Sequence, residues 1–136
     1  MRVLGFSQKW PKLEQDTFTT FRFQRKDKDW YVDEVVQVVY KPRSKEREVL
    51  GTAKIVGKEA RYMAWGGSGL TQPKVTNAEA IEDGFPDGYN PFGTRKSGYF
   101  YMWEWLLDTY GGRRLLDEPM NKITLKWEAK YDTAKS

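Results

Sequence analysis

The stretch WPKLEQDTFTTFR, residues 10–22, combines a short helical turn with the beginning of a β-strand. Pro11 suits the first helical position, because its missing N–H would have no helical partner there. Residues 17–23 are rich in β-branched and aromatic side chains, which indicates a strand. Side chains alternate across a strand, so Thr20 and Arg22 share one face, opposite an aromatic one. We expect the aromatic face to join the core and the other to be a working surface.

The chain has 136 residues, of which 39% are hydrophobic and 15% aromatic. This length and composition predict a single folded domain over residues 1–131, followed by a polar C-terminal tail over 132–136. No apolar run approaches the roughly 20 residues that span a bilayer, and no signal peptide is visible. We therefore expect a cytoplasmic protein without a membrane partner.

The sequence contains no cysteine and no histidine. Disulfides, zinc–thiolate sites, cysteine nucleophiles, Ser-His-Asp triads and histidine-ligated metals are thereby excluded. An all-oxygen Mg²⁺ or Ca²⁺ site stays open in principle. No EF-hand loop, Walker motif or GxGxxG is present, so we expect no cofactor and no structural metal.

The net charge is +4 and the sequence pI is near 9.2, which permits a nucleic-acid partner without requiring one. Basic residues gather in 22–28, 41–47 and 113–114. The turn at 41–47 carries Lys41, Arg43, Lys45 and Arg47. It could follow a phosphate backbone, but the glutamates within and beside it favour an ordinary solvated turn.

The remaining pattern predicts an α+β fold. Strands are expected at 2–6, 30–40, 49–56, 61–65 and 121–131, and helices at 76–83 and 98–110. The strand at 30–40 is apolar enough to be buried on both faces, and Gly51 suggests a bulge or a close backbone approach. Short connections favour antiparallel pairing. We predict a small curled β-barrel of about five or six mainly antiparallel strands, with two to three helices at its mouth.

Two helical signals and one loop complete this prediction. Thr76 and Glu79 have the spacing of a capping box. In the helix at 98–110, one stripe is apolar and is expected in the core: Phe100, Trp103, Leu107 and Tyr110, with Leu106 widening it. The loop at 86–97 carries Tyr89 and Phe92 beside Arg95 and Lys96. Its aromatic rings could stack on unpaired bases or insert into the core.

Several short motifs then occur in a familiar order. They are Phe6 and Trp10 with Leu13, Thr20-x-Arg22, Asp33-Glu34-Val35-Val36, Gly51-x-Ala53-x-Ile55, Glu82-Asp83-Gly84-Phe85 and Tyr110-Gly111. In this order and spacing the chain resembles the ASCH domain family, within the PUA-like superfamily, over nearly its whole length. The resemblance implies a PUA-like β-barrel with a cleft between barrel and helices that accepts RNA or a modified nucleoside.

Some members of that family resemble amidohydrolases of N4-acetylcytidine, and others look like ribonucleases. The amidohydrolases use a K-x-x-T motif and a glutamate, whose counterparts here are Thr20 and Glu82. Thr17 stands where the family has its lysine, and a threonine hydroxyl is no unaided base, although Asp16 or Lys9 could compensate. The resemblance thus makes Thr20 and Glu82 catalytic candidates only if the protein is an enzyme, and favours binding over catalysis.

The leading hypothesis is a nucleic-acid-binding module for RNA or single strands. Thr20, Arg22 and Glu82 would line a cleft that holds a base or nucleotide. The candidate nucleic-acid-binding residues are Lys9, Thr17, Thr20, Arg22, Lys41, Arg43, Tyr89, Arg95 and Lys96. Arg22 could instead be structural and pair with a carboxylate such as Glu82. The alternatives are a metal-independent hydrolase of a modified nucleoside or of RNA, and a protein-interaction domain.

Overall fold

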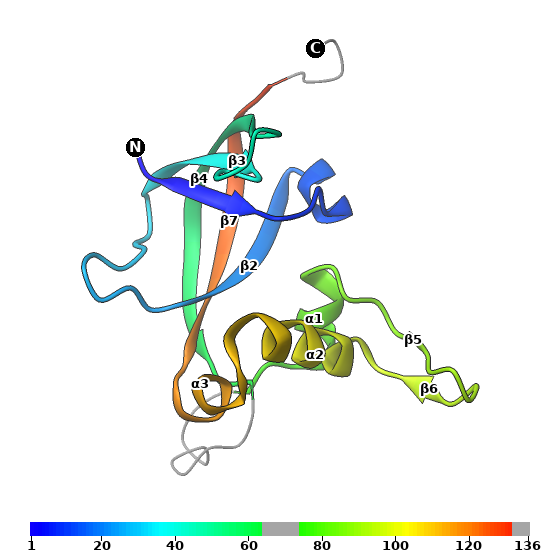
Figure 1. Cartoon of the computed structure of the whole chain (residues 1–136). Helices are drawn as coiled ribbons and strands as arrows, with labels where there is room; N and C mark the ends of the chain where they lie inside the picture. The colour runs from blue at the N-terminus through cyan, green and yellow to red at the C-terminus, as the bar shows by residue number, and fades with distance from the viewer. Residues whose placement is uncertain (64–73, 132–136) are drawn as a thin grey trace.

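The computed structural model describes residues 1–63 and 74–131, and within them the fold is α+β (Figure 1). A curled, mixed five-stranded sheet forms a half-barrel, accompanied by three α-helices and a small two-stranded ribbon. In chain order the elements are β1 (Val3–Phe6), the 3-10 turn η1 (Pro11–Glu14), β2 (Thr17–Phe23), β3 (Val35–Tyr40), β4 (Glu48–Arg61), α1 (Asn77–Glu82), β5 (Gly88–Tyr89), β6 (Arg95–Lys96), α2 (Gly98–Tyr110), α3 (Gly112–Asp117) and β7 (Met120–Lys130).

The large sheet has the strand order β1-β3-β4-β7-β2, so β1 and β2 are its edges. The pairs β3–β4, β4–β7 and β2–β7 are antiparallel, as predicted, whereas β1 and β3 pair in parallel. Among the described residues the two edge strands form no ladder with each other, and the sheet is therefore open along that side. This open side positions the site described below.

The strands β4 and β7 form the longest ladder of the sheet. The predicted close approach at Gly51 is confirmed, because a Cβ there would lie 2.2 Å from the carbonyl oxygen of Ala129. The pairing register shifts beside it, between Val38 and Val39 on β3. The strand itself is longer than the predicted 49–56 and continues to Arg61.

Two apolar clusters lie on opposite faces of β2. Phe18 joins the cluster inside the half-barrel, with Leu4, Val36 and Ile55 among its members. Phe21 and Phe23 join the cluster beneath the helices. The expectation that only one face of this strand enters the core is therefore wrong. The aromatic face packs beneath the helices, as predicted, but the opposite face carries Phe18 into the core inside the half-barrel and buries Thr20, which is 4% exposed.

The helices begin and end close to their predicted positions. Thr76 and Glu79 form the predicted capping box on α1, and α2 occupies the predicted range 98–110. The buried face of α2 agrees with the prediction only in part. Leu106 is buried, and Trp103 and Tyr110 pack against the cluster beneath the helices, as predicted. Met102 is buried as well, whereas Phe100 and Leu107 are 56% and 38% exposed. Apolar side chains surround this helix, so periodicity alone did not identify the face that meets the sheet.

Other differences are local. The strand β3 begins at Val35 rather than at residue 30, because the chain turns at Asp33, where φ is 76°. Val35 is 36% exposed, so two-sided burial does not extend to the start of this strand. The segment predicted as a loop at 86–97 contains the β5–β6 ribbon. Of the predicted strand at 61–65, Arg61 is the last residue of β4 and Tyr62 forms an isolated bridge with Lys74. Residues 64–73, which hold the end of that strand and nearly all of the loop predicted at 66–74, and the tail at 132–136 lie outside the described residues.

No helix in the described part of the chain has the length and apolar character needed to cross a membrane.

Candidate functional site

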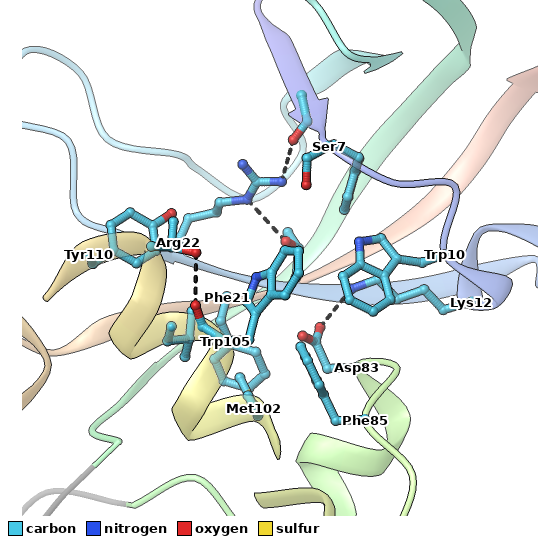
Figure 2. A pocket seen from close by; sticks show the side chains of 15 residues that line it. Ser7, Trp10, Lys12, Phe21, Arg22, Asp83, Phe85, Met102, Trp105 and Tyr110 are labelled. Carbon is cyan, nitrogen blue, oxygen red and sulfur yellow. Dashed lines mark hydrogen bonds and ion pairs between the residues drawn. The ribbon is translucent and has the colours of Figure 1, made fainter. Parts of the chain in front are cut away.

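A pocket of about 250 Å³ opens between the two edge strands of the sheet (Figure 2). Residues 5–7, at the end of β1 and just after it, and residues 20–22 of β2 line the pocket. Trp10, just before η1, and Lys12 within it also contribute, as do residues 83 and 85 after α1, and α2 forms the remaining wall. The pocket thus lies where the half-barrel is open and where the helices approach it.

A buried ion pair stands at one side of the pocket. The ammonium Nζ of Lys12 lies 2.9 Å from Oδ1 of Asp83, and these side chains are only 5% and 7% exposed. The hydroxyl of Thr19 also donates to Oδ1, at 3.1 Å. Burial raises the pKa of the Asp83 carboxyl and lowers the pKa of the Lys12 ammonium, because each charge has lost its water. Their mutual attraction offsets only part of that loss.

The backbone after α1 aims Asp83 at this lysine. Asp83 is the C-cap residue of α1, and the chain reverses at Gly84, where φ is 116°. Such a φ is disfavoured for any residue with a Cβ. A Cβ on Gly84 would also lie 3.1 Å from the ring of Trp10, so glycine permits the close packing of this corner against η1.

Arg22 occupies the other side of the pocket and connects the two edge strands. Its Nε donates to the Thr20 hydroxyl at 3.0 Å, and its Nη2 donates to the Gly5 carbonyl at 2.7 Å. The guanidinium carbon lies 5.0 Å from the ring centroid of Phe6. Burial lowers the pKa of Arg22 from its ordinary value, although the group stays charged at any physiological pH. Among the described residues it pairs with no carboxylate.

Two polar atoms of the pocket remain available to a ligand. In the described part of the chain, Oδ2 of Asp83 and Nη1 of Arg22 have no hydrogen-bond partner. No fully buried side-chain nitrogen or oxygen there lacks a partner, so both atoms keep some exposure, and both residues line the pocket. The pocket therefore offers a hydrogen-bond acceptor from Asp83 and a donor from Arg22.

Aromatic rings form the wall beside the ion pair. The ring of Trp10 lies 5.2 Å from Phe85 and 5.3 Å from Trp105, measured between centroids. Figure 2 shows these rings gathered around the mouth between Lys12 and α2. Large rings packed against each other hold their positions, so they offer a planar ligand a preformed stacking surface.

The structure brings only two of the predicted site residues, Thr20 and Arg22, into this pocket. Glu82 is exposed at the end of α1 and is absent from the pocket lining, which instead contains its neighbour Asp83. Thr17 is exposed as well. The alternative, a structural pairing of Arg22 with Glu82, is not formed, and Arg22 instead bonds Thr20 and the Gly5 carbonyl.

The other predicted residues lie on the surface, away from the pocket lining. Lys9 pairs with Glu48 at 2.9 Å and Lys41 with Glu46 at 2.6 Å, while Arg43 is exposed on the turn after β3. Arg95 and Lys96 form ion pairs on the β5–β6 ribbon, next to Tyr89. Tyr89 is 72% exposed and Phe92 is 93% exposed, so insertion of these rings into the core is wrong.

Sequence reasoning missed Lys12 and Asp83. For Asp83 a signal existed: it follows Glu79 by four positions and Ala80 by three, which places it on the buried face of α1. For Lys12 there was none, because a single 3-10 turn has no repeat from which to predict the direction of a side chain. Among the described residues, no group of three or more acidic side chains could hold a metal ion.

Comparisons of the chain with protein-family models, with curated proteins and with solved structures gave no match.

Proposed function

We propose that this protein is a nucleic-acid-binding module of the ASCH type, with a PUA-like fold, and that its pocket holds one unpaired base of RNA or of another single strand. The observation that carries the proposal is the free acceptor on Asp83 and the free donor on Arg22 in one aromatic pocket. The curled, open sheet agrees with a PUA-like barrel.

The pocket chemistry suits a nucleobase. A base presents ring faces that stack on aromatic side chains and edges that carry both donors and acceptors. Asp83 would accept from an amino or ring N–H group, and Arg22 would donate to a carbonyl or ring nitrogen. The volume of about 250 Å³ is slightly below the range of drug-sized ligand sites, which favours a single base. A base in a duplex has its edge occupied, so single strands are favoured.

The test is binding of a fluorescently labelled RNA octamer of mixed sequence. Replacement of Arg22 by Met removes the donor and its charge, and we expect the affinity to fall at least about tenfold. Lys126→Met is the matched control, because it removes one charge from the exposed Lys126 on β7. Circular dichroism would verify that both proteins fold. Equal affinity of Arg22→Met and the wild type would contradict the proposal.

A second candidate function is supported by Lys12. Burial lowers the pKa of this amine, and a neutral lysine can act as a base or nucleophile. Lys12 would then supply the amine that Thr17, at the lysine position of the resembled family, cannot. This favours a metal-independent hydrolase of a modified nucleoside. Release of acetate from N4-acetylcytidine, abolished by Lys12→Met, would support it; no release by the wild type would reject it.

A further inference from the structure

A groove of about 500 Å³ adjoins the pocket and shares Arg22 and Tyr110 with it. Residues 22–27 at the end of β2, together with Trp30, form one side, and Tyr110 and Arg114 form the other. Beyond Arg114 a third hollow of about 390 Å³ follows, lined by residues 110–114 and Glu118. We call this continuous path, from Arg22 to residues 113–114, the basic groove.

The charges of the basic groove are predominantly positive. Five basic side chains line it, against the two carboxylates of Asp27 and Glu118. The basic residues are Arg22, Arg25, Lys26, Arg113 and Arg114. This excess continues from the pocket, whereas no residue of the basic turn at 41–47 lines the pocket or the groove. A path of this charge attracts a polyanion.

The ion pairs within the groove leave its cations available. Arg25 lies 3.2 Å from Asp27, and Arg114 lies 3.2 Å from Glu118, all on exposed or half-exposed side chains. Such surface pairs are weak, so a phosphate can displace them. In the described part of the chain, Lys26 forms no ion pair.

Two of the arginines are oriented by aromatic rings. The guanidinium carbon of Arg114 lies 4.1 Å from the ring centroid of Phe23, and that of Arg25 lies 5.6 Å from the ring of Trp30. A guanidinium stacked on a ring keeps the N–H groups at its edge free for phosphate oxygens. In Figure 1, α3 accordingly lies near the end of β2.

We propose that the basic groove binds the phosphates adjacent to the base in the pocket, so that a single strand runs from the pocket past Arg22 toward α3. This proposal rests on the proposed function and adds the path of the backbone. Continuity with an aromatic pocket favours a nucleic acid over an acidic peptide, which has no base to insert. The path also differs from the predicted contacts at Lys41 and Arg43.

The experiment compares two double replacements, each removing two exposed cations. Arg25→Ala/Lys26→Ala alters the groove. Lys54→Ala/Lys126→Ala is the matched control, because these two lysines are cross-strand neighbours on β4 and β7, outside the groove. The affinity of each protein for the labelled RNA octamer is measured over a range of salt concentrations, and its affinity for a free ribonucleoside is measured by calorimetry.

We expect the groove replacement to weaken octamer binding about tenfold and to reduce the slope of log K against log salt by about 1.4, since each phosphate contact on a single strand contributes about 0.7. Nucleoside affinity should not change, and the control should match the wild type throughout. If the groove replacement binds the octamer with unchanged affinity and an unchanged salt slope, the groove proposal is overturned, while the proposed function of the pocket stands. Failure of the wild type to bind either the octamer or a nucleoside would overturn the proposed function with it. Equal affinity for an octaglutamate peptide would overturn the assignment of the groove to nucleic acid.

Discussion

Two buried carboxylates of the same short helix have opposite surroundings. Glu79 accepts the backbone N–H of Thr76 at 3.0 Å, and its Oε2 lies 2.8 Å from Lys122 and 3.1 Å from Arg61. Asp83, one turn later, has a single cation, Lys12, and one hydroxyl donor, both on the same oxygen. One carboxylate is saturated by the protein, and the other keeps an oxygen for a ligand.

The pKa values of these two carboxyl groups also shift in opposite directions. Burial opposes the ionisation of both groups. For Glu79, Lys122, the Thr76 amide and Arg61 outweigh burial and hold the pKa below its usual range. For Asp83, burial prevails and raises the pKa. We infer that ionised Glu79 stabilises the fold. Ionised Asp83 instead lowers the stability of the fold, because its carboxylate is buried with fewer partners and faces the pocket.

The largest effect is expected on stability at Glu79. Glu79→Ala leaves Arg61 and Lys122 without their shared anion and removes the capping box, so we expect the free energy of unfolding to fall by about 3 kcal/mol. Urea denaturation measures it. Glu59→Ala, which removes only an exposed partner of Arg61, should change stability by no more than about 0.5 kcal/mol. A loss below about 1 kcal/mol in Glu79→Ala would remove the contrast with Asp83.

A smaller effect on stability, combined with a loss of RNA binding, is expected at the ion pair of Lys12 and Asp83. Lys12→Met/Asp83→Asn removes both buried charges and keeps an acceptor for Thr19. Because replacing both partners of a buried ion pair is often nearly neutral for stability, the free energy of unfolding should change by no more than about 1 kcal/mol. Affinity for the RNA octamer should fall at least about tenfold. Destabilisation by about 3 kcal/mol would instead identify this pair as structural.

Low pH should affect the stability contributions of Glu79 and Asp83 in opposite directions. A depressed folded pKa means that Glu79 contributes stability above the ordinary glutamate value of about 4.3, and that this contribution is lost as the pH falls through the folded value. The stability difference between the wild type and Glu79→Gln should therefore shrink in acid.

For Asp83 the sign is reversed. Its raised pKa means that the folded state takes up a proton at a higher pH than the unfolded chain, so ionised Asp83 costs stability and protonation relieves that cost. Binding of a nucleobase, which uses the Asp83 carboxylate as an acceptor, should weaken as the pH falls through the raised pKa of Asp83. A pH titration of octamer binding measures the effect, and Asp83→Asn should lack this dependence. Wild-type binding that keeps its strength as the carboxyl protonates would contradict the role of Asp83.

The smallest effect is expected at Glu82, the residue before Asp83 in the sequence. Glu82 is exposed and lies outside the pocket, so Glu82→Gln should leave octamer affinity unchanged and alter unfolding by less than about 0.5 kcal/mol. Asp83→Asn serves as its paired comparison and should weaken binding. If Glu82→Gln weakened binding and Asp83→Asn did not, the assignment of the two carboxylates would be reversed.

Local patterns predicted the elements and part of the site. Strand alternation grouped Thr20 with Arg22, and both line the pocket. The partner across the pocket was not predictable in the same way, because the direction of Lys12 depends on how η1 packs on the corner at Gly84. The motif of the resembled family suggested Glu82, but helical geometry buries Asp83 instead.

The meeting of β1 and β2 also depends on tertiary structure. Short connections predicted antiparallel neighbours, whereas β1 pairs in parallel with β3 and becomes an edge. Arg22 then reaches the Gly5 carbonyl across the open side of the sheet. No local sequence signal reports such a contact between two edges, which is why the pocket could be expected in outline only.

Binding of a base in the aromatic pocket can be observed through the indole N–H signals of the tryptophans in ¹H–¹⁵N NMR spectra while each of the four ribonucleosides is added in turn. Trp10 and Trp105 line the pocket, and Trp127 does not. If the pocket holds a base, at least one nucleoside shifts the Trp10 and Trp105 signals saturably and leaves the Trp127 signal in place. Nucleoside binding that leaves Trp10 and Trp105 unmoved would contradict it.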